Sequence, residues 1–305
     1  MKNFSRERKI TLLEERTPGA LALLDDCAIC PRECHVDRSA GSDKGICGVD
    51  SRLKVSSANL HFGEEPPISG VRGSGTIFFS GCNLKCVFCQ NYALSQLRHG
   101  EYITIDNLAD MMLDLQERGA HNINLVTPSH YVPQIMAGLL LACKGGLTLP
   151  IVYNSSGYDK VETLQLLDGI IEIYMPDMRY ASKDSARCYS TAVDYPEVNR
   201  AAIKEMHRQV GELVLDKHEI AIQGLLVRHL VLPENIAGSD DVFKFLADEV
   251  SPDTFVSLMS QYFPAHRALT MNKVNRRILN SEYQAALNSF ERAGLGNGFI
   301  QPYDE

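Results

Sequence analysis

The sequence predicts an α/β fold with a parallel sheet, because six strand–helix units follow one another between residues 76 and 294. Alternation with this spacing builds a parallel sheet whose strands are joined by helical crossovers. Six units fit either a doubly wound sheet or an incomplete barrel. In both architectures the active groups gather at the carboxyl ends of the strands.

The strands are predicted from short runs that are rich in β-branched and aromatic residues and are bounded by Gly, Pro or polar turn residues. In chain order they are TIFFSGC (76–82), INLVTP (123–128), LPIVYNSSG (149–157), IIEIYMPDM (170–178), GLLVRHLVLP (224–233) and TFVSLMSQYFP (254–264).

The helices are predicted from amphipathic spacing, and several of them stop at a glycine. In chain order they are NLADMMLDLQERG (107–119), VPQIMAGLLLACKGG (132–146), DKVETLQLLDG (159–169), VNRAAIKEMHRQVGE (198–212), DVFKFLADEV (241–250) and SEYQAALNSFERAG (281–294).

Residues 1–62 are predicted to form a separate, small cysteine-rich unit, and residues 63–305 the barrel. The stretch CPRECHVDRSAGSDKGICG is polar and turn-rich, and no long periodic run accompanies it. The connector GEEPPISGVRGSG (63–75) is rich in Gly and Pro, as linkers and turns are. We therefore expect a loop-rich unit that its cysteines hold together.

Composition excludes several classes of partner. The formal net charge is -8 and no Lys/Arg block stands out, so no nucleic-acid footprint is expected. The longest apolar stretch, near 135–143, is far shorter than the ~20 residues of a membrane helix. The first residues lack the apolar core of a secretory signal. These features predict a soluble cytoplasmic protein.

Three of the nine cysteines lie within eight residues, in the stretch CNLKCVFC, at Cys82, Cys86 and Cys89. Thiolates are the usual ligands of iron–sulfur clusters, and a [4Fe–4S] cluster normally takes four of them. Three local ligands leave one iron open, and an open position distinguishes a catalytic metal from a structural one. A zinc site completed by a distant ligand is the alternative.

Four further cysteines follow the spacing C-x2-C-x3-C-x12-C, at Cys27, Cys30, Cys34 and Cys47. This set can close a tetrahedral zinc site or hold a second, fully ligated iron–sulfur cluster. His35 is adjacent and is a substitute ligand. A structural metal that holds a loop-rich unit is favoured over a redox role, and spacing does not choose between zinc and iron–sulfur.

The segment GCNLKCVFCQN resembles the signature of the radical S-adenosylmethionine superfamily, in which an aromatic residue, here Phe88, precedes the last cysteine. Asn91 ends the matching segment. The resemblance implies a partial (β/α)6 barrel, a [4Fe–4S] cluster and S-adenosylmethionine. It also implies a reaction in which one electron cleaves S-adenosylmethionine to methionine and a 5′-deoxyadenosyl radical, which removes hydrogen from a substrate.

Most of residues 63–305 is most similar to the group of the pyruvate formate-lyase activating enzyme, among relatives with an N-terminal cysteine unit. YNSSGYD, PDMR, VRHLVLP and FPAH resemble that group's cofactor-binding segments. They map onto Asn154 and Ser155, Asp177 and Arg179, Arg228, and His266. The group's Gly-Gly-Glu is replaced by VTPSHY, so Ser129, His130 or the backbone near Thr127 is expected to hold the methionine ammonium.

Three functions are compatible with these patterns. The first is a radical enzyme that acts on a glycine of a partner protein, as a glycyl-radical activating enzyme does, with an electron donor such as flavodoxin or ferredoxin. The second is a radical enzyme that modifies a small molecule or a peptide. The third is a non-catalytic metal-binding redox sensor, which the polar residues at successive strand ends disfavour.

Overall fold

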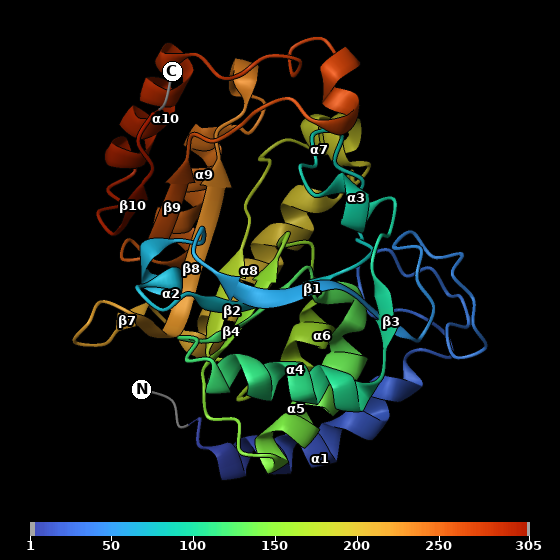
Figure 1. Cartoon of the computed structure of the whole chain (residues 1–305). Helices are drawn as coiled ribbons and strands as arrows, with labels where there is room; N and C mark the ends of the chain where they lie inside the picture. Colours follow the sequence, from blue (N-terminus) through green and yellow to red (C-terminus); the bar gives the residue numbers. More distant parts are fainter. Residues whose placement is uncertain (1–3, 304–305) are drawn as a thin grey trace.

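The computed structural model describes residues 4–303, and a single ten-stranded sheet forms its centre (Figure 1). The strands are β1 (Leu53–His61), β2 (Ser74–Phe79), β3 (Glu101–Ile103), β4 (Ile123–Val126), β5 (Ile151–Ser155), β6 (Ile173–Pro176), β7 (Val214–Leu215), β8 (Ala221–Leu230), β9 (Phe255–Met259) and β10 (Gly298–Ile300). Their order in the sheet is β10-β9-β8-β6-β5-β4-β2-β1-β3, and β7 pairs with β8.

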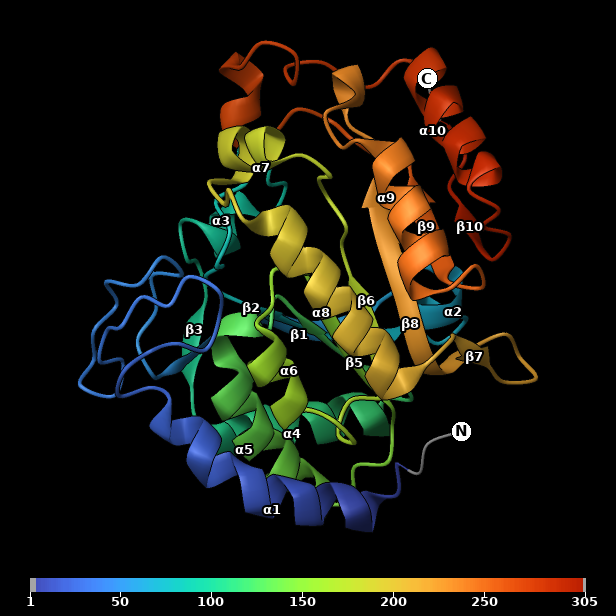
Figure 2. The same ribbon diagram turned by 180° about the vertical axis from the view of Figure 1, so that it is seen from behind.

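The helices lie outside this sheet (Figure 1, Figure 2). They are α1 (Arg6–Ala22), α2 (Pro66–Ser69), α3 (Tyr92–Ser95), α4 (Ile105–Glu117), α5 (Val132–Lys144), α6 (Val161–Leu166), α7 (Lys183–Ser190), α8 (Tyr195–Val210), α9 (Ser239–Phe245) and α10 (Asn280–Arg292). Short helical turns are η1 (Ser129–Tyr131), η2 (Pro233–Asn235), η3 (Leu246–Val250) and η4 (His266–Thr270). No helix of residues 4–303 is both long and apolar enough to span a membrane.

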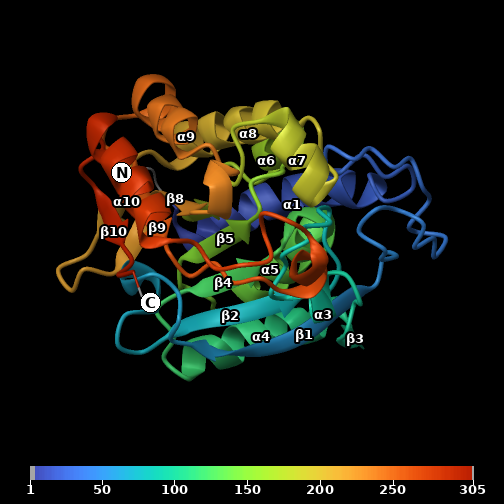
Figure 3. The same cartoon turned by 90° about the horizontal axis from the view of Figure 1, so that it is seen from above.

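The strand order selects the barrel over the doubly wound sheet. The six predicted strands are β2, β4, β5, β6, β8 and β9, and they are parallel neighbours in the same order as in the chain. A doubly wound sheet would reverse direction around its first strand. The prediction of a partial (β/α)6 barrel is therefore confirmed. Figure 3 shows the strands from above, with helices outside them.

Every residue of β5 is buried, as expected for a parallel strand covered on both faces. Successive helices pack in pairs, such as α4 with α5 and α9 with α10. The six predicted helices all form, and their observed ends differ from the predicted ones by a few residues. Local periodicity was sufficient here because each unit buries one face on the strand beside it.

The N-terminal segment is more ordered than its sequence indicated. We expected a loop-rich unit in residues 1–62, but α1 is a long helix that packs along α5 (Figure 2). Lys9 forms a buried ion pair with Glu172, and Arg16 donates to the carbonyl of Asp168 at 2.7 Å. Sequence periodicity missed this helix because charged residues alternate there with single apolar ones. Its polar contacts fasten it to the barrel.

β1 also belongs to the predicted N-terminal unit, yet it pairs antiparallel with β2 of the barrel. The segment 1–62 is thus attached to the barrel through α5 on one side and β2 on the other. The division into units 1–62 and 63–305 remains a prediction. The loops that carry the N-terminal cysteines lie between these two attachments, beside β3 (Figure 1).

Candidate functional site

The cysteine triplet lies on an irregular loop directly after β2, at the carboxyl end of the barrel strands. Three backbone hydrogen bonds fix the loop from two sides. Val87 donates to the carbonyl of Tyr189 on α7 at 2.8 Å, and Lys85 donates to that of Ser190 at 3.3 Å. From the other side, Ala268 of η4 donates to the carbonyl of Val87 at 2.9 Å. The loop is therefore held between α7 and η4.

Each of the three sulfur atoms has a hydrogen-bonding neighbour. The Cys82 Sγ accepts from the Leu84 amide at 3.4 Å. The Cys89 Sγ lies 3.2 Å from the Ser95 hydroxyl. The Cys86 Sγ accepts from two side chains, from Arg179 Nη1 at 3.1 Å and from Ser190 Oγ at 2.9 Å. Donors to sulfur stabilise a thiolate more than a neutral thiol, so they suit cysteines that ligate iron.

Burial opposes ionisation of two of these thiols, although the nearby charge of Arg179 acts against it. Burial raises the pKa of Cys82 to about 12, and it raises the pKa of Cys89 as well. A bound metal reverses this preference, because a coordinated thiol is deprotonated outright. The donor set therefore fits a [4Fe–4S] cluster held by three thiolates, with its fourth iron left for another ligand.

Within residues 4–303, no three His, Cys, Asp or Glu side chains are arranged to hold a single metal ion. A cluster makes a different demand, because each cysteine binds a separate iron and the sulfurs surround a volume. Assignment of the three cysteines as cluster ligands stays a prediction.

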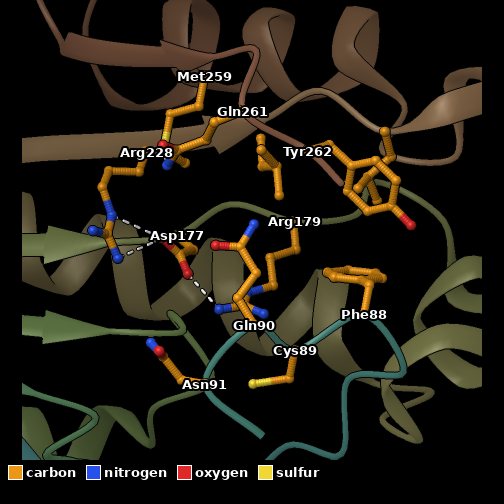
Figure 4. A pocket seen from close by; sticks show the side chains of 12 residues that line it. Phe88, Cys89, Gln90, Asn91, Asp177, Arg179, Arg228, Met259, Gln261 and Tyr262 are labelled. Atoms are coloured by element: carbon orange, nitrogen blue, oxygen red, sulfur yellow. Dashed lines mark hydrogen bonds and ion pairs between the residues drawn. The ribbon is translucent and has the colours of Figure 1, made fainter. Parts of the chain in front are cut away.

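A cavity of about 210 Å³ opens beside the loop (Figure 4). Its lining combines the cysteine loop with the ends of β6, β8 and β9. The lining residues are Phe88, Cys89, Gln90, Asn91, Asp177, Arg179, Arg228, Leu230, Leu232, Met259, Gln261 and Tyr262. A cofactor that contacted Cys89 could therefore also reach the charged groups at the strand ends.

Asp177 stands between two arginines in this cavity (Figure 4). Its carboxylate accepts from Arg228 Nε at 2.9 Å and from Arg179 Nη2 at 2.5 Å. Burial disfavours the charged carboxylate, but the two guanidinium groups outweigh it and hold the pKa of Asp177 below its ordinary value. Both arginine pKa values are raised, since the favourable charges of their neighbours outweigh the burial that opposes ionisation. The site is thus a fixed, ionised cluster.

Asn154 and Glu64 extend this cluster behind Arg228. Arg228 Nη2 donates to Asn154 Oδ1 at 2.7 Å, and its Nη1 lies 3.4 Å from Glu64 Oε2. Burial raises the pKa of Glu64, and Arg228 opposes that rise. Asn154 therefore positions Arg228 from outside the cavity lining. Its predicted contact with the ribose stays a prediction.

Five predicted cofactor residues do not line this cavity: Asn154, described above, and four others. Ser129 and Ser155 both hydrogen bond to the buried Asp159; the Ser155 hydroxyl donates at 2.6 Å. His266 lies on η4, where its ring stacks on Tyr92 at 4.7 Å. His130 lines a different cavity, described below. The sequence correctly placed these residues after strands, but a strand-end position does not determine which way a side chain points.

Sequence reasoning did not identify half of the cavity lining. The missed residues are Gln90, Leu230, Leu232, Met259, Gln261 and Tyr262. Gln90 follows the last cysteine directly, so adjacency was an available signal for it. The others are mostly apolar residues at the ends of β8 and β9, and their composition alone does not distinguish them from core residues.

The four N-terminal cysteines line a second cavity, together with Arg38 and His130. Cys27, Cys30 and Cys47 are buried, and Cys34 is half-buried. Burial raises the pKa of Cys30 to about 12, and the other three thiols add to that rise. The structure thus brings all four together in one place, as their spacing suggested. Their role as a metal site stays a prediction.

The chain is similar to a protein family, to a curated protein and to a solved structure. Residues 76–176 match the model of the radical SAM superfamily. The uncharacterized protein MJ0674 of Methanocaldococcus jannaschii is 28% identical over 296 residues, which cover 94% of this chain and 80% of that protein. A structure of TYW1 with a lysine–pyruvate adduct bound is similar with a TM-score of 0.44 and 14% identity, covering 71% of this chain and 73% of that one. Residues 76–176 are thus similar to the radical SAM superfamily, in agreement with the resemblance of the cysteine loop.

Proposed function

We propose that this chain is a radical S-adenosylmethionine enzyme. One observation carries the proposal: a single cavity is lined both by Cys89 of the cysteine loop and by the Asp177–Arg228 pair at the strand ends. When bound and reduced, the cluster and S-adenosylmethionine supply a 5′-deoxyadenosyl radical, with methionine as the other product. The protein residues bind, orient and shield these groups.

The charged residues of the cavity are matched to S-adenosylmethionine. Its α-carboxylate suits a guanidinium such as Arg228, which can bind a carboxylate through two parallel N–H donors. Its ribose hydroxyls and its positive charge suit the ionised Asp177. Asn91 lines the same wall beside Cys89 and adds an amide. Phe88 packs against Tyr262 with ring centroids 5.7 Å apart, so the apolar wall beside the cysteine loop is rigid.

The far wall of the cavity favours an uncharged substrate group. It consists of Leu230, Leu232, Met259 and Tyr262, with the amide of Gln261 among them. A backbone glycine of a partner protein has this character: it carries no charge, and its flanking peptide groups can hydrogen bond to an amide. We therefore infer a glycine-containing segment of a partner protein as the substrate, with a small molecule or a free peptide as the alternative.

The electron that starts the reaction must come from outside the chain. A low-potential donor such as flavodoxin or ferredoxin is the proposed partner for this step. The loop that carries the cysteines is close to the surface at α3, where Gln90, Asn91 and Tyr92 are exposed. This is the side from which a donor could approach the cluster loop.

Anaerobic incubation of the reconstituted protein with dithionite and S-adenosylmethionine tests the proposal. Formation of 5′-deoxyadenosine is the expected result. If the protein binds iron but forms none above the rate of free cluster, a non-catalytic metal-binding sensor is the better interpretation.

The substrate class is tested separately by isotope transfer. A candidate partner protein labelled with deuterium at glycine should transfer deuterium into 5′-deoxyadenosine. Transfer from a labelled small-molecule extract in place of the protein would favour the alternative substrate class. Because both arms use the same cleavage reaction, failure of one arm does not put the cleavage activity in question.

A further inference from the structure

The N-terminal cavity is lined by four thiols that the proposed reaction does not use. Free cysteine behaves as a small apolar residue, and its reactivity usually decides its role. Here, however, four such side chains from a loop-rich segment share one small cavity with two arginines and a histidine. Polar and thiol side chains thus line a cavity of the kind that aliphatic side chains line in a hydrophobic core. This arrangement is typical of a ligand-binding site.

His130 provides a second, independent indication. Its Nε2 lies 2.9 Å from the carbonyl oxygen of Ser80. Because a carbonyl only accepts, Nε2 must carry the hydrogen, and Nδ1 is left with a free lone pair. Among residues 4–303 nothing donates to Nδ1, although the side chain is only 1% exposed. A buried acceptor without a donor costs free energy unless something occupies the space beside it.

This state of His130 is typical of a metal-binding histidine. Such a residue donates one ring N–H to a carbonyl or carboxylate and presents the other nitrogen to the metal. Burial also lowers the pKa of His130 to about 3, so the ring is neutral. The cavity is therefore lined by four cysteines and by a histidine whose Nδ1 has no donor among the described residues, and thiol sulfur and imidazole nitrogen are both donor types that bind soft metals.

Backbone hydrogen bonds hold the turns that carry the cysteines beside one another. Cys27 and Val36 are paired through a backbone hydrogen bond of 3.1 Å, and the Glu33 amide donates to the carbonyl of Cys30 at 3.0 Å. The Cys34 Sγ accepts from the Ile46 amide at 3.4 Å. The four cysteines therefore line one cavity although they come from separate turns.

We propose that Cys27, Cys30, Cys34 and Cys47 bind a thiophilic metal centre, zinc or an iron–sulfur cluster, in the cavity that His130 also lines. Zinc and an iron–sulfur cluster are both bound through cysteine thiolates. Each S–H bond is replaced by a sulfur–metal bond, and the proton is released to solvent. The energy gained stabilises the loop-rich segment, because the ligands are not preformed in the unfolded chain.

The site lies directly behind the loop of the catalytic cysteines. Arg32, between two of the four cysteines, donates to the carbonyls of Asn83 at 2.8 Å and Thr191 at 2.6 Å. Gly81 has φ 87°, and a Cβ placed there would lie 2.9 Å from the carbonyl oxygen of Cys47. The metal centre would thus hold the base of the catalytic loop in place.

The test uses the full chain with Cys82, Cys86 and Cys89 all changed to Ala, which removes the first site. This protein is exposed anaerobically either to zinc alone or to iron with sulfide, is desalted, and is analysed for metal. We expect one stoichiometric centre, of either metal. The two arms identify which metal it is.

Three further variants make the result decisive. Adding Cys27→Ala and Cys30→Ala to the triple variant should remove the centre, whereas adding Cys188→Ala, on an exposed position of α7, should not. His130→Ala should weaken metal retention against a chelator by about tenfold, as loss of a residue beside a metal does. The proposal is overturned if the triple variant holds no more metal than the fivefold cysteine variant.

Insolubility of the fivefold variant would not remove the test, because wild-type protein gives an independent measurement. Its metal content should exceed that of one [4Fe–4S] cluster. If the extra metal is iron, S-adenosylmethionine should change the electron paramagnetic resonance signal of only one of two reduced clusters, because only one has an open iron. Wild-type protein with metal for a single cluster would contradict the proposal.

Discussion

The two cysteine regions of this chain are held in place by different means. The loop of Cys82, Cys86 and Cys89 is fixed by elements far away in the sequence: α7, η4 and the end of β6 all contact it. Five backbone hydrogen bonds link residues within the segment of Cys27 to Cys47, and side chains also fasten it to the barrel: Arg38 donates to the carbonyl of His130 at 2.7 Å, and Thr163 donates to that of Ile29 at 2.6 Å. The first region is held by the barrel, and the second is held by its own turns as well as by the barrel.

Because of this difference, we expect changes in the two regions to have different effects, on cofactor cleavage in the first and on local stability in the second. Loss of a cysteine ligand from the barrel loop should leave a folded protein that does not cleave S-adenosylmethionine, because the barrel holds the loop whether or not a metal is bound. Loss of a ligand from the N-terminal segment should loosen that segment first. The chemistry should suffer only through contacts such as Arg32 to the carbonyl of Asn83.

Replacing Cys82, Cys86 or Cys89 with Ala should have the largest effect on cofactor cleavage. Each change removes a thiolate ligand, so formation of 5′-deoxyadenosine should be abolished. The thermal unfolding temperature of the metal-free protein should change little, because the loop lies at the barrel mouth. The exposed Cys188→Ala is the matched control and should keep full activity. Any triplet variant with wild-type activity would refute the cluster assignment.

Changes at the charged residues Asp177 and Arg228 should have the second-largest effect. Arg228→Ala and Asp177→Asn each remove a contact of about 1.5–3 kcal/mol to a charged group. We expect S-adenosylmethionine to bind roughly 10- to 150-fold more weakly, at about 1.4 kcal/mol per decade, with the iron content unchanged. Equilibrium titration of the reconstituted protein measures this.

The double variant sharpens the same prediction. Arg228 and Asp177 contact each other, so their effects should not add, and the double variant should bind more tightly than the product of the two single effects predicts. Unchanged affinity in both single variants would mean that the cluster is structural.

Replacing Arg179 should have a smaller effect, and we expect it on the reduction potential of the cluster. It donates to the Cys86 Sγ, and such a donor stabilises the more negative, reduced cluster. Arg179→Leu should therefore lower the reduction potential of the cluster by roughly 60 mV, a tenfold change in a one-electron equilibrium. Arg179→Lys, which keeps the charge, should recover part of the shift. A potentiometric titration followed by electron paramagnetic resonance would count against this role if Arg179→Leu left the potential unchanged.

The N-terminal double variant Cys27→Ala and Cys30→Ala should affect cleavage least. Soluble yield should fall, and amide hydrogens of residues 20–60 should exchange faster, because the segment loses its metal-linked stability. Cleavage at the first cluster should persist at a reduced rate. Unchanged exchange in 20–60 with unchanged metal content would show that these cysteines do not hold a metal.

Sequence alone predicted the six strand–helix units and the cysteine triplet after the first of them, because both features are encoded locally. Each strand–helix unit carries its own periodicity, and three closely spaced cysteines need no distant partner to be recognised. The same local rule failed for α1, whose attachment depends on polar contacts such as Lys9 with Glu172, far apart in the chain.

Only the tertiary structure decided which strand-end residues share a cavity. Asp177, Arg179 and Arg228 meet there because β6 and β8 are neighbours, and the bridge between Asp177 and Arg228 aligns their side chains. His130 and Ser155 are equally well placed in sequence, but they point to Ser80 and Asp159 instead. Side-chain direction depends on how neighbouring elements pack, and sequence spacing does not contain that information.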